Sequence, residues 1–156
     1  MDTLTALALI TGVLIAIWTF LSIAILPDLL PWVGLATWAC FFAAGGKTQG
    51  FQKTVFASLS GLVYVWVMML LLPRFGGSTL VYAILLGAIA VLMVVQSKFP
   101  PLSFIPGAFI GAAVTVGSGG GADLSHLLYV GLSLVAGAAL GFASETVAGS
   151  LATKQQ

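Results

Sequence analysis

The chain has 156 residues, of which 60% are hydrophobic and only 6% are charged, and its formal net charge is +1. Because about a quarter of the residues in a soluble domain are charged, this composition excludes an ordinary soluble protein and indicates a polytopic membrane protein. The near-neutral charge gives no reason to expect a nucleic-acid partner. Cys40 is the only cysteine, which excludes an internal disulfide and a cysteine-based metal site.

Six apolar segments follow one another along the chain, separated by prolines, glycines and the few charged residues. They cover about residues 5–26, 32–44, 54–72, 79–97, 102–117 and 125–148. A full membrane span needs roughly 20 apolar residues, so the second and fifth segments are marginal. The first segment is too long for a signal-peptide core and has no basic region before it, so we expect a membrane helix. We predict an all-α integral membrane protein with six transmembrane helices in a single domain, residues 1–156.

The few basic residues predict the orientation of these six spans. Lys47, Lys53, Lys98 and Lys154 fall on one side of the membrane, and Arg74 falls on the other. Because basic loops stay in the cytoplasm, we expect both termini, including a short tail at residues 151–156, to be cytoplasmic. Residues 47–53 are expected to form a polar turn on that side.

The two halves of the chain come into register when the sequence is shifted by about 75 residues. The pair Gly45-Gly46 then falls over Gly119-Gly120, and each half contains a long, a short and a long segment. Three spans are an odd number, so the second half enters the membrane from the opposite face. We expect two inverted repeats, at about residues 1–76 and 77–150; six generic helices with coincidental breakers are the alternative.

The second segment of each half is short, rich in aromatic residues and followed by glycines. A short or broken apolar segment is tolerated at membrane depth only where protein or a water-filled cavity satisfies its backbone, and a matching pair indicates a transport site. Pro106 removes a backbone donor and Gly107 permits close helix approach, so we expect a short, broken second helix in each repeat. Residues 38–46 and 104–111 should meet near the membrane midplane. The predicted substrate pathway consists of Trp38, Phe41, Phe42, Gly45, Phe104, Pro106, Gly107 and Phe109.

Two further residues are candidates for a gating or polar role. Asp123 or Ser125 is expected to cap the sixth helix, which places His126 at the membrane interface; gating by His126 is a second hypothesis, since histidine titrates near neutral pH. Glu145 lies closest to the membrane interior, although contact with water or Lys154 fits the sequence equally well. No nucleophile–base pair or set of metal ligands is visible, so we expect no catalytic residue, metal or cofactor, and no enzyme activity.

The runs WACFFAAGG at residues 38–46 and FIPGAFIG at residues 104–111 resemble the DUF1097 family of small bacterial inner-membrane proteins. The resemblance covers nearly the whole chain and implies a location in the bacterial inner membrane, but no activity. The plan of two three-helix halves is similar in outline to urea channels, without a filter motif that would carry a substrate over.

Two functional hypotheses follow from the sequence. The first is a channel or facilitator for a small, neutral or weakly charged solute, with the pathway between the repeats and aromatic side chains at its constriction. The second is a non-transporting membrane scaffold or assembly subunit, suggested by the many glycine and alanine packing faces. The expected partners are the lipid bilayer, a small solute and further copies of the chain, with a trimer suggested by analogy with channels.

Overall fold

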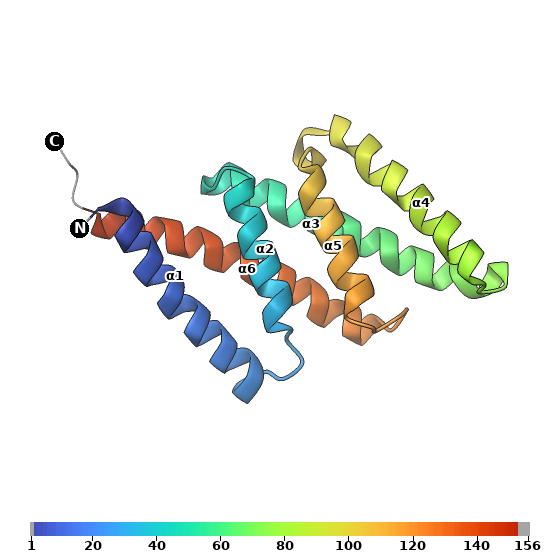
Figure 1. Cartoon of the computed structure of the whole chain (residues 1–156), viewed down its shortest axis with the longest axis horizontal. Helices are drawn as coiled ribbons and strands as arrows, with labels where there is room; N and C mark the ends of the chain where they lie inside the picture. The colour runs from blue at the N-terminus through green and yellow to red at the C-terminus, as the bar shows by residue number, and fades with distance from the viewer. Residues whose placement is uncertain (1, 153–156) are drawn as a thin grey trace.

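The structure, a computed structural model, describes residues 2–152, and all regular structure in that range is helical (Figure 1). The helices in chain order are α1 (Thr3–Phe20) with the π-helical turn η1 (Leu21–Ile25), α2 (Pro31–Ala43), α3 (Lys47–Leu71) with the 3-10 turn η2 (Leu72–Phe75), α4 (Thr79–Val95), the 3-10 turns η3 (Gln96–Lys98) and η4 (Pro100–Leu102), α5 (Ile105–Gly117) and α6 (Leu124–Leu151). Lys154 and most of the expected tail lie outside the described residues, whereas α6 itself continues to Leu151.

Four helical segments are long and apolar enough to cross a membrane, as the sequence predicted. They are Thr3–Ile25, Lys47–Phe75, Thr79–Lys98 and Leu124–Leu151. Helices α2 and α5 contain 13 residues each, which gives a length of about 20 Å at 1.5 Å per residue. They are therefore shorter than the hydrocarbon core of a bilayer, which is about 30 Å thick.

The prediction that the second helix of each repeat is broken is wrong, because both short helices are continuous. Pro31 and Pro106 lie in the first turns of α2 and α5. The first amides of a helix have no partner within the helix, so proline loses no hydrogen bond there and its fixed φ suits the start of the helix. Pro106 therefore starts α5 and does not free a carbonyl in its interior.

The predicted polar turn at residues 47–53 is also wrong, since these residues form the first two turns of α3. Lysine and glutamine are good helix formers, and the chain reverses before them at Gly45 and Gly46, which have φ values of 95° and 65°. The polar residues thus lie on a helix end that extends beyond the apolar span. Asp123, by contrast, caps α6 as predicted, accepting hydrogen bonds from the backbone N–H groups of Ser125 and His126.

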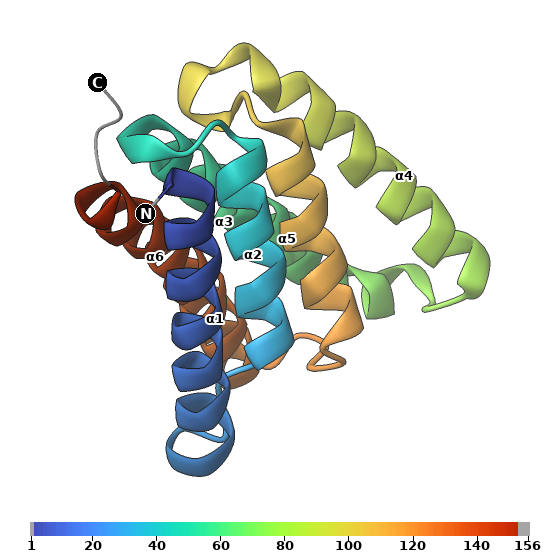
Figure 2. The ribbon, with the colours of Figure 1, turned by 60° about the vertical axis from the view of Figure 1, so that its left-hand side comes forward.

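The central four helices pack in a crossed arrangement. Helix α2 packs mainly against α6, and α5 packs mainly against α3, while α3 and α6 also contact each other (Figures 1 and 2). Helix α1 packs against α6, and α4 packs against α3 and α5 at the other side of the molecule. Helices α2 and α5 lie side by side and run in opposite directions.

Glycines allow the central helices to approach to backbone contact. A methyl group on Gly61 of α3 would overlap the carbonyl of Ala108 in α5, and one on Gly137 of α6 would overlap the carbonyl of Gly34 in α2. Large apolar side chains, including Val33 and Leu134, fill the space around these crossings with no exposed surface. The centre of the bundle is therefore closely packed.

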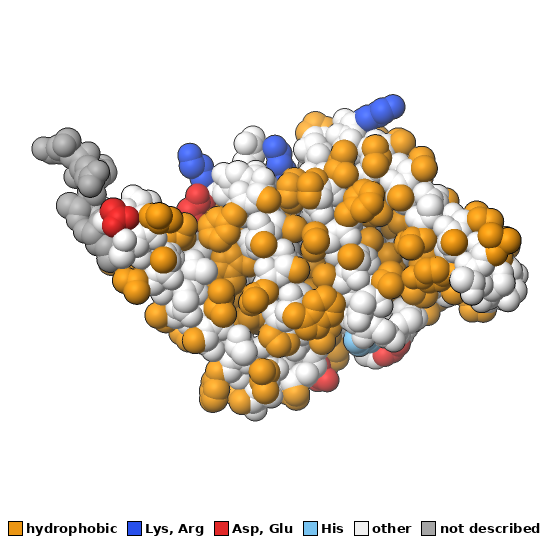
Figure 3. Space-filling model, viewed as in Figure 1, with side chains coloured by type: hydrophobic (Ala, Val, Ile, Leu, Met, Phe, Trp, Pro, Cys, Tyr) orange, Lys and Arg blue, Asp and Glu red, His pale blue; other side chains and the backbone are white. Residues whose placement is uncertain are grey.

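On the face that Figure 3 shows, apolar side chains are spread over the helices, and basic side chains gather along one edge. Lys47 begins α3, Lys53 follows in its second turn, and Lys98 ends η3. We call this side of the molecule the basic end. The opposite end contains η2 and the loop between α5 and α6.

Candidate functional site

The two segments that the sequence predicted to meet lie at the basic end of the bundle and not at its midplane. Helix α2 ends at Ala43, just before Lys47, and α5 begins at Ile105, just after the turn that contains Lys98. The antiparallel course of the two helices therefore brings residues 38–46 and 104–111 to the same end. Their neighbours are mainly α6 and α3, respectively.

The aromatic residues of α2 divide between the core and the outer surface. Trp38 is 3% exposed, and its indole N–H donates to Ser144 Oγ of α6 at 3.2 Å. Phe41 is fully buried and meets the ring of Phe142 edge-on, with 6.4 Å between ring centroids. Phe42 is 38% exposed. Trp38 and Phe41 therefore attach α2 to α6.

The predicted pathway residues at the start of α5 also divide between the core and the outer surface. Phe104 packs in a cluster around Ala57 of α3, and Gly107 is buried against that same alanine. Pro106 and Phe109 are exposed on the outside of the bundle. Gly45, the remaining candidate, lies in the loop before α3 with no other atom near its Cβ position. The eight residues thus lie on separate surfaces and do not surround one cavity.

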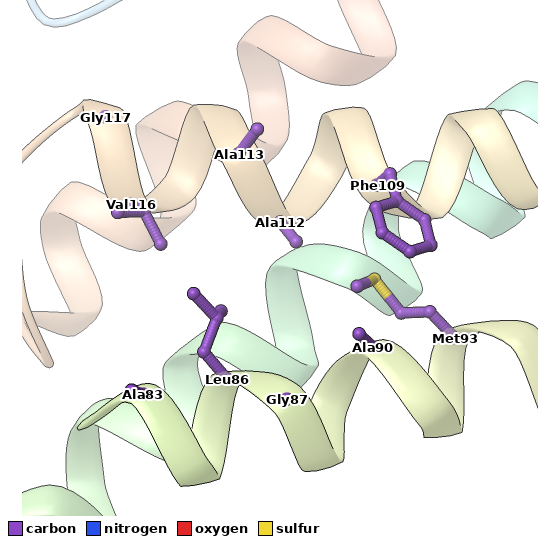
Figure 4. A pocket seen from close by; sticks show the side chains of 10 residues that line it. All are labelled: Ala83, Leu86, Gly87, Ala90, Met93, Phe109, Ala112, Ala113, Val116 and Gly117. Carbon is purple, nitrogen blue, oxygen red and sulfur yellow. The ribbon is translucent and has the colours of Figure 1, made fainter. Parts of the chain in front are cut away.

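An apolar groove of about 660 Å³ separates α4 from α5 (Figure 4). Phe109 and Met93 lie opposite each other at one end, and Leu86 and Val116 lie toward the other end. The lining residues are Ala83, Leu86, Gly87, Ala90, Met93, Phe109, Ala112, Ala113, Val116 and Gly117. This lining offers no polar side chain to a solute.

Buried hydroxyl groups in the four central helices are a feature that the aromatic pattern did not reveal. Six hydroxyl residues of these helices are buried, namely Thr37, Thr54, Ser58, Thr115, Ser133 and Ser144. Thr37 and Thr115 donate to the carbonyls of Val33 and Gly111, one turn back in their own helices, at 2.9 and 2.7 Å. Thr54 Oγ1 is buried without a hydrogen-bond partner. A buried polar atom without a partner is unusual and indicates a place for a water molecule or a ligand group.

A second buried polar contact connects α3 to the turn after α4. Gln96 is 5% exposed, and its side-chain amide N–H donates to Ser60 Oγ at 2.9 Å. The amide oxygen of Gln96 is buried and has no hydrogen-bond partner. The sequence indicates this contact only by the position of Gln96, directly after a long apolar run. An amide side chain carries no charge, so an argument from charged residues does not include it.

Glu145 and His126 lie toward opposite ends of α6. Glu145 Oε2 accepts a hydrogen bond from the backbone N–H of Lys47 at 2.6 Å, at the amino-terminal end of α3. A carboxylate there is favoured by the helix dipole. The ring of His126 lies against Gly120, and its Nε2 atom is buried without a partner. The hydrogen bonds from Ser125 and His126 hold the pKa of the Asp123 carboxyl below its ordinary value. Within residues 2–152, no three potential metal ligands come together.

The long apolar helices, the apolar outer surface and the basic edge define a small polytopic α-helical membrane protein. The sequence matches the family described as "Protein of unknown function (DUF1097)" over residues 8–149, and the chain belongs to this family.

Three relatives are similar to the chain over about three quarters of its length. The chain is 32% identical over 116 residues to "Inner membrane protein YcdZ" of Escherichia coli K12, which covers 74% of this chain and 70% of that protein. It is 34% identical over 119 residues to the protein of the same name from Salmonella typhimurium, covering 74% and 71% of the two chains. The "Uncharacterized protein YahC" of Escherichia coli K12 is 29% identical over 128 residues, covering 76% and 78%. No solved structure matches the chain.

Proposed function

We propose that the protein is a channel or facilitator for a small, neutral or weakly charged solute, with the pathway between two inverted three-helix repeats. The observation that carries the proposal is the reciprocal packing of the two halves. Helices α1 and α2 of the first half pack on α6, the third helix of the second half. Helices α4 and α5 of the second half pack on α3, the third helix of the first half. Inverted repeats with a site at their interface are a common plan of membrane transporters.

Two close backbone contacts support this relation between the halves. Gly61 meets the backbone of α5 at Ala108, and Gly137 meets the backbone of α2 at Gly34. Gly61 and Gly137, like Gly34 and Ala108, are about 75 residues apart, which is the shift that aligns the two sequence halves. Repeats spanning residues 1–76 and 77–150 account for both contacts.

The interior chemistry supports a neutral solute. The buried hydroxyls of α2, α3, α5 and α6 offer hydrogen bonds without charge, and Thr54 Oγ1 has no protein partner. The close packing of the centre corresponds to a closed state, so passage requires the two repeats to move apart. We therefore propose selection by shape and hydrogen bonding, and no enzyme activity.

The same proposal includes an orientation and an assembly. We place the basic end and both termini in the cytoplasm, because Lys47, Lys53 and Lys98 lie together at that end. The relatives named as inner membrane proteins support the bacterial inner membrane as the location. We further propose a homo-oligomer, with a trimer as the form to test first, surrounded by lipid.

Flux into proteoliposomes tests the transport proposal. The purified chain is reconstituted, and swelling is followed by stopped-flow light scattering with a panel that includes urea, acetamide and glycerol. We expect at least one solute to enter faster than it enters protein-free vesicles. Thr54→Val should lower that rate several-fold, because it replaces the unpartnered hydroxyl by a methyl group of similar size.

The matched control is Thr146→Val, which changes an exposed hydroxyl on α6 and should leave the rate unaltered. Equal entry of every solute into loaded and empty vesicles would remove the proposal. Equal rates for Thr54→Val and the wild type would place the pathway away from Thr54.

A non-transporting scaffold or assembly subunit is the second candidate, and the packing of the centre favours it. Phe41, Val33 and Leu134 have no exposed surface, and glycines join the helices through backbone contacts. Such a core needs no open state. A folded, reconstituted chain that passes none of the solutes would support this function.

A further inference from the structure

A pocket of about 290 Å³ lies at the basic end, between the first turns of α3 and the turn η4. It is lined by Gln49, Gln52, Lys53, Phe56, Pro100 and Pro101. The side chains of Gln49, Gln52 and Lys53 supply N–H donors, and no acidic side chain is among the lining residues. The pocket is therefore suited to an anion.

Polar and apolar groups follow each other in layers along α3. Phe56 lies one turn further into the helix than Lys53, or about 4.5 Å along its axis, and its ring is 51% exposed. Phe99, just before the two prolines, is 64% exposed. The N–H donors of the pocket therefore lie closer to the start of α3 than the exposed Phe56 ring does. We expect this order where a membrane helix passes from the water interface into the bilayer.

No carboxylate competes for an anion in the pocket wall. Lys53 is the charged residue among the lining side chains. The acid Glu145 accepts a hydrogen bond from the backbone of Lys47 at the start of α3 and is not part of the lining. An anion in the pocket therefore meets the ammonium group of Lys53 without an acidic neighbour in the wall.

We infer that this pocket binds the phosphate headgroup of an anionic phospholipid. Lys53 and the amide groups of Gln49 and Gln52 contact the phosphate, and an acyl chain runs down along Phe56. Basic pockets beside membrane helices recognise such headgroups. The exposed rings distinguish this site from one for free phosphate, which would leave them without a contact. The inference does not depend on transport.

Lipid-dependent thermal stability tests the site. The full chain is purified in a neutral detergent, and unfolding is followed with a thiol-reactive dye that reports exposure of the buried Cys40. Phosphatidylglycerol should raise Tm by several degrees, because a ligand that binds the folded state stabilises it. Phosphatidylcholine and inorganic phosphate should give no comparable shift. The phosphatidylglycerol effect should fall as the salt concentration rises.

Variants locate the effect. Lys53→Gln should abolish most of the shift caused by phosphatidylglycerol, whereas Lys53→Arg should retain it. Lys47→Gln and Lys98→Gln are the matched controls, since both lysines lie at the same end but outside the pocket lining. A full shift in Lys53→Gln, or an equal shift with phosphatidylcholine, would overturn the inference. An equal shift with inorganic phosphate would overturn the lipid assignment.

Discussion

Single glycines determine how closely the central helices approach. Gly137 of α6 meets the backbone carbonyl of Gly34, so any side chain at position 137 must move α2 away. Gly149 lies on the same helix with no other atom near its Cβ position. A substitution at Gly137 therefore changes both helix packing and helix propensity, whereas the same substitution at Gly149 changes helix propensity alone.

We expect Gly137→Ala to lower the free energy of unfolding by about 1–3 kcal/mol, the usual cost of overpacking a close contact. Gly149→Ala should instead raise it by up to about 1 kcal/mol, because alanine favours the helix. Unfolding in mixed detergent micelles measures both values. Equal effects of the two substitutions would show that α2 and α6 are not in backbone contact.

The aromatic candidates show why the sequence could not specify the site at this scale. Phe41 and Phe42 are adjacent on one short helix and lie about 100° apart around its axis, yet Phe41 is buried against Phe142 of α6 and Phe42 is exposed. In a soluble protein, the polar face of a helix distinguishes these positions. Here lipid is as apolar as the protein core, so hydrophobicity carries no information about direction.

At the scale of elements, the number, order and approximate bounds of the helices could be read from the sequence. The errors occurred at helix starts. Pro106 was interpreted as a break because proline disrupts a helix interior, but its position in the first turn has the opposite effect. The residues after Lys47 are good helix formers and allow α3 to start there, but the hydrogen bond from Lys47 to Glu145 joins residues that are far apart in the sequence.

Helix α4 offers a test of polar contacts between elements. It lies at the edge of the bundle, and the hydrogen bond from Gln96 to Ser60 connects its end to α3. A double-mutant cycle of Gln96→Leu and Ser60→Ala should give a coupling energy of about 0.6 kcal/mol, and at most about 1.7 kcal/mol. The measurement is the free energy of unfolding of the four proteins in mixed micelles.

The matched control is a cycle of Gln96→Leu with Ser97→Ala. Ser97 follows directly in sequence but donates only to the carbonyl of Val94. Its coupling to Gln96 should be indistinguishable from zero. A coupling as large as that of Ser60 would mean that the first cycle reports loss of the turn and not the hydrogen bond.

At the scale of the whole molecule, the proposed inverted relation of the two halves predicts where equivalent residues lie. Thr48 follows the first double glycine, and Ala122 follows the glycine run of the second half; the two are exposed and about 75 residues apart. If the repeats are inverted, these equivalent positions lie on opposite sides of the membrane. Parallel repeats would place them on the same side.

Single cysteines measure this directly, because Cys40→Ala leaves a background without any thiol. In that background we expect a membrane-impermeant maleimide to label Ala122→Cys in intact spheroplasts and Thr48→Cys only in inverted vesicles. In the proposed orientation, the lysines at the start of α3 put position 48 in the cytoplasm, and position 122 lies in the loop at the opposite end. Labelling of both cysteines from one side would exclude the inverted repeat, and with it the reciprocal packing as an argument for transport. Labelling of position 48 from outside would keep the repeat and reverse its orientation.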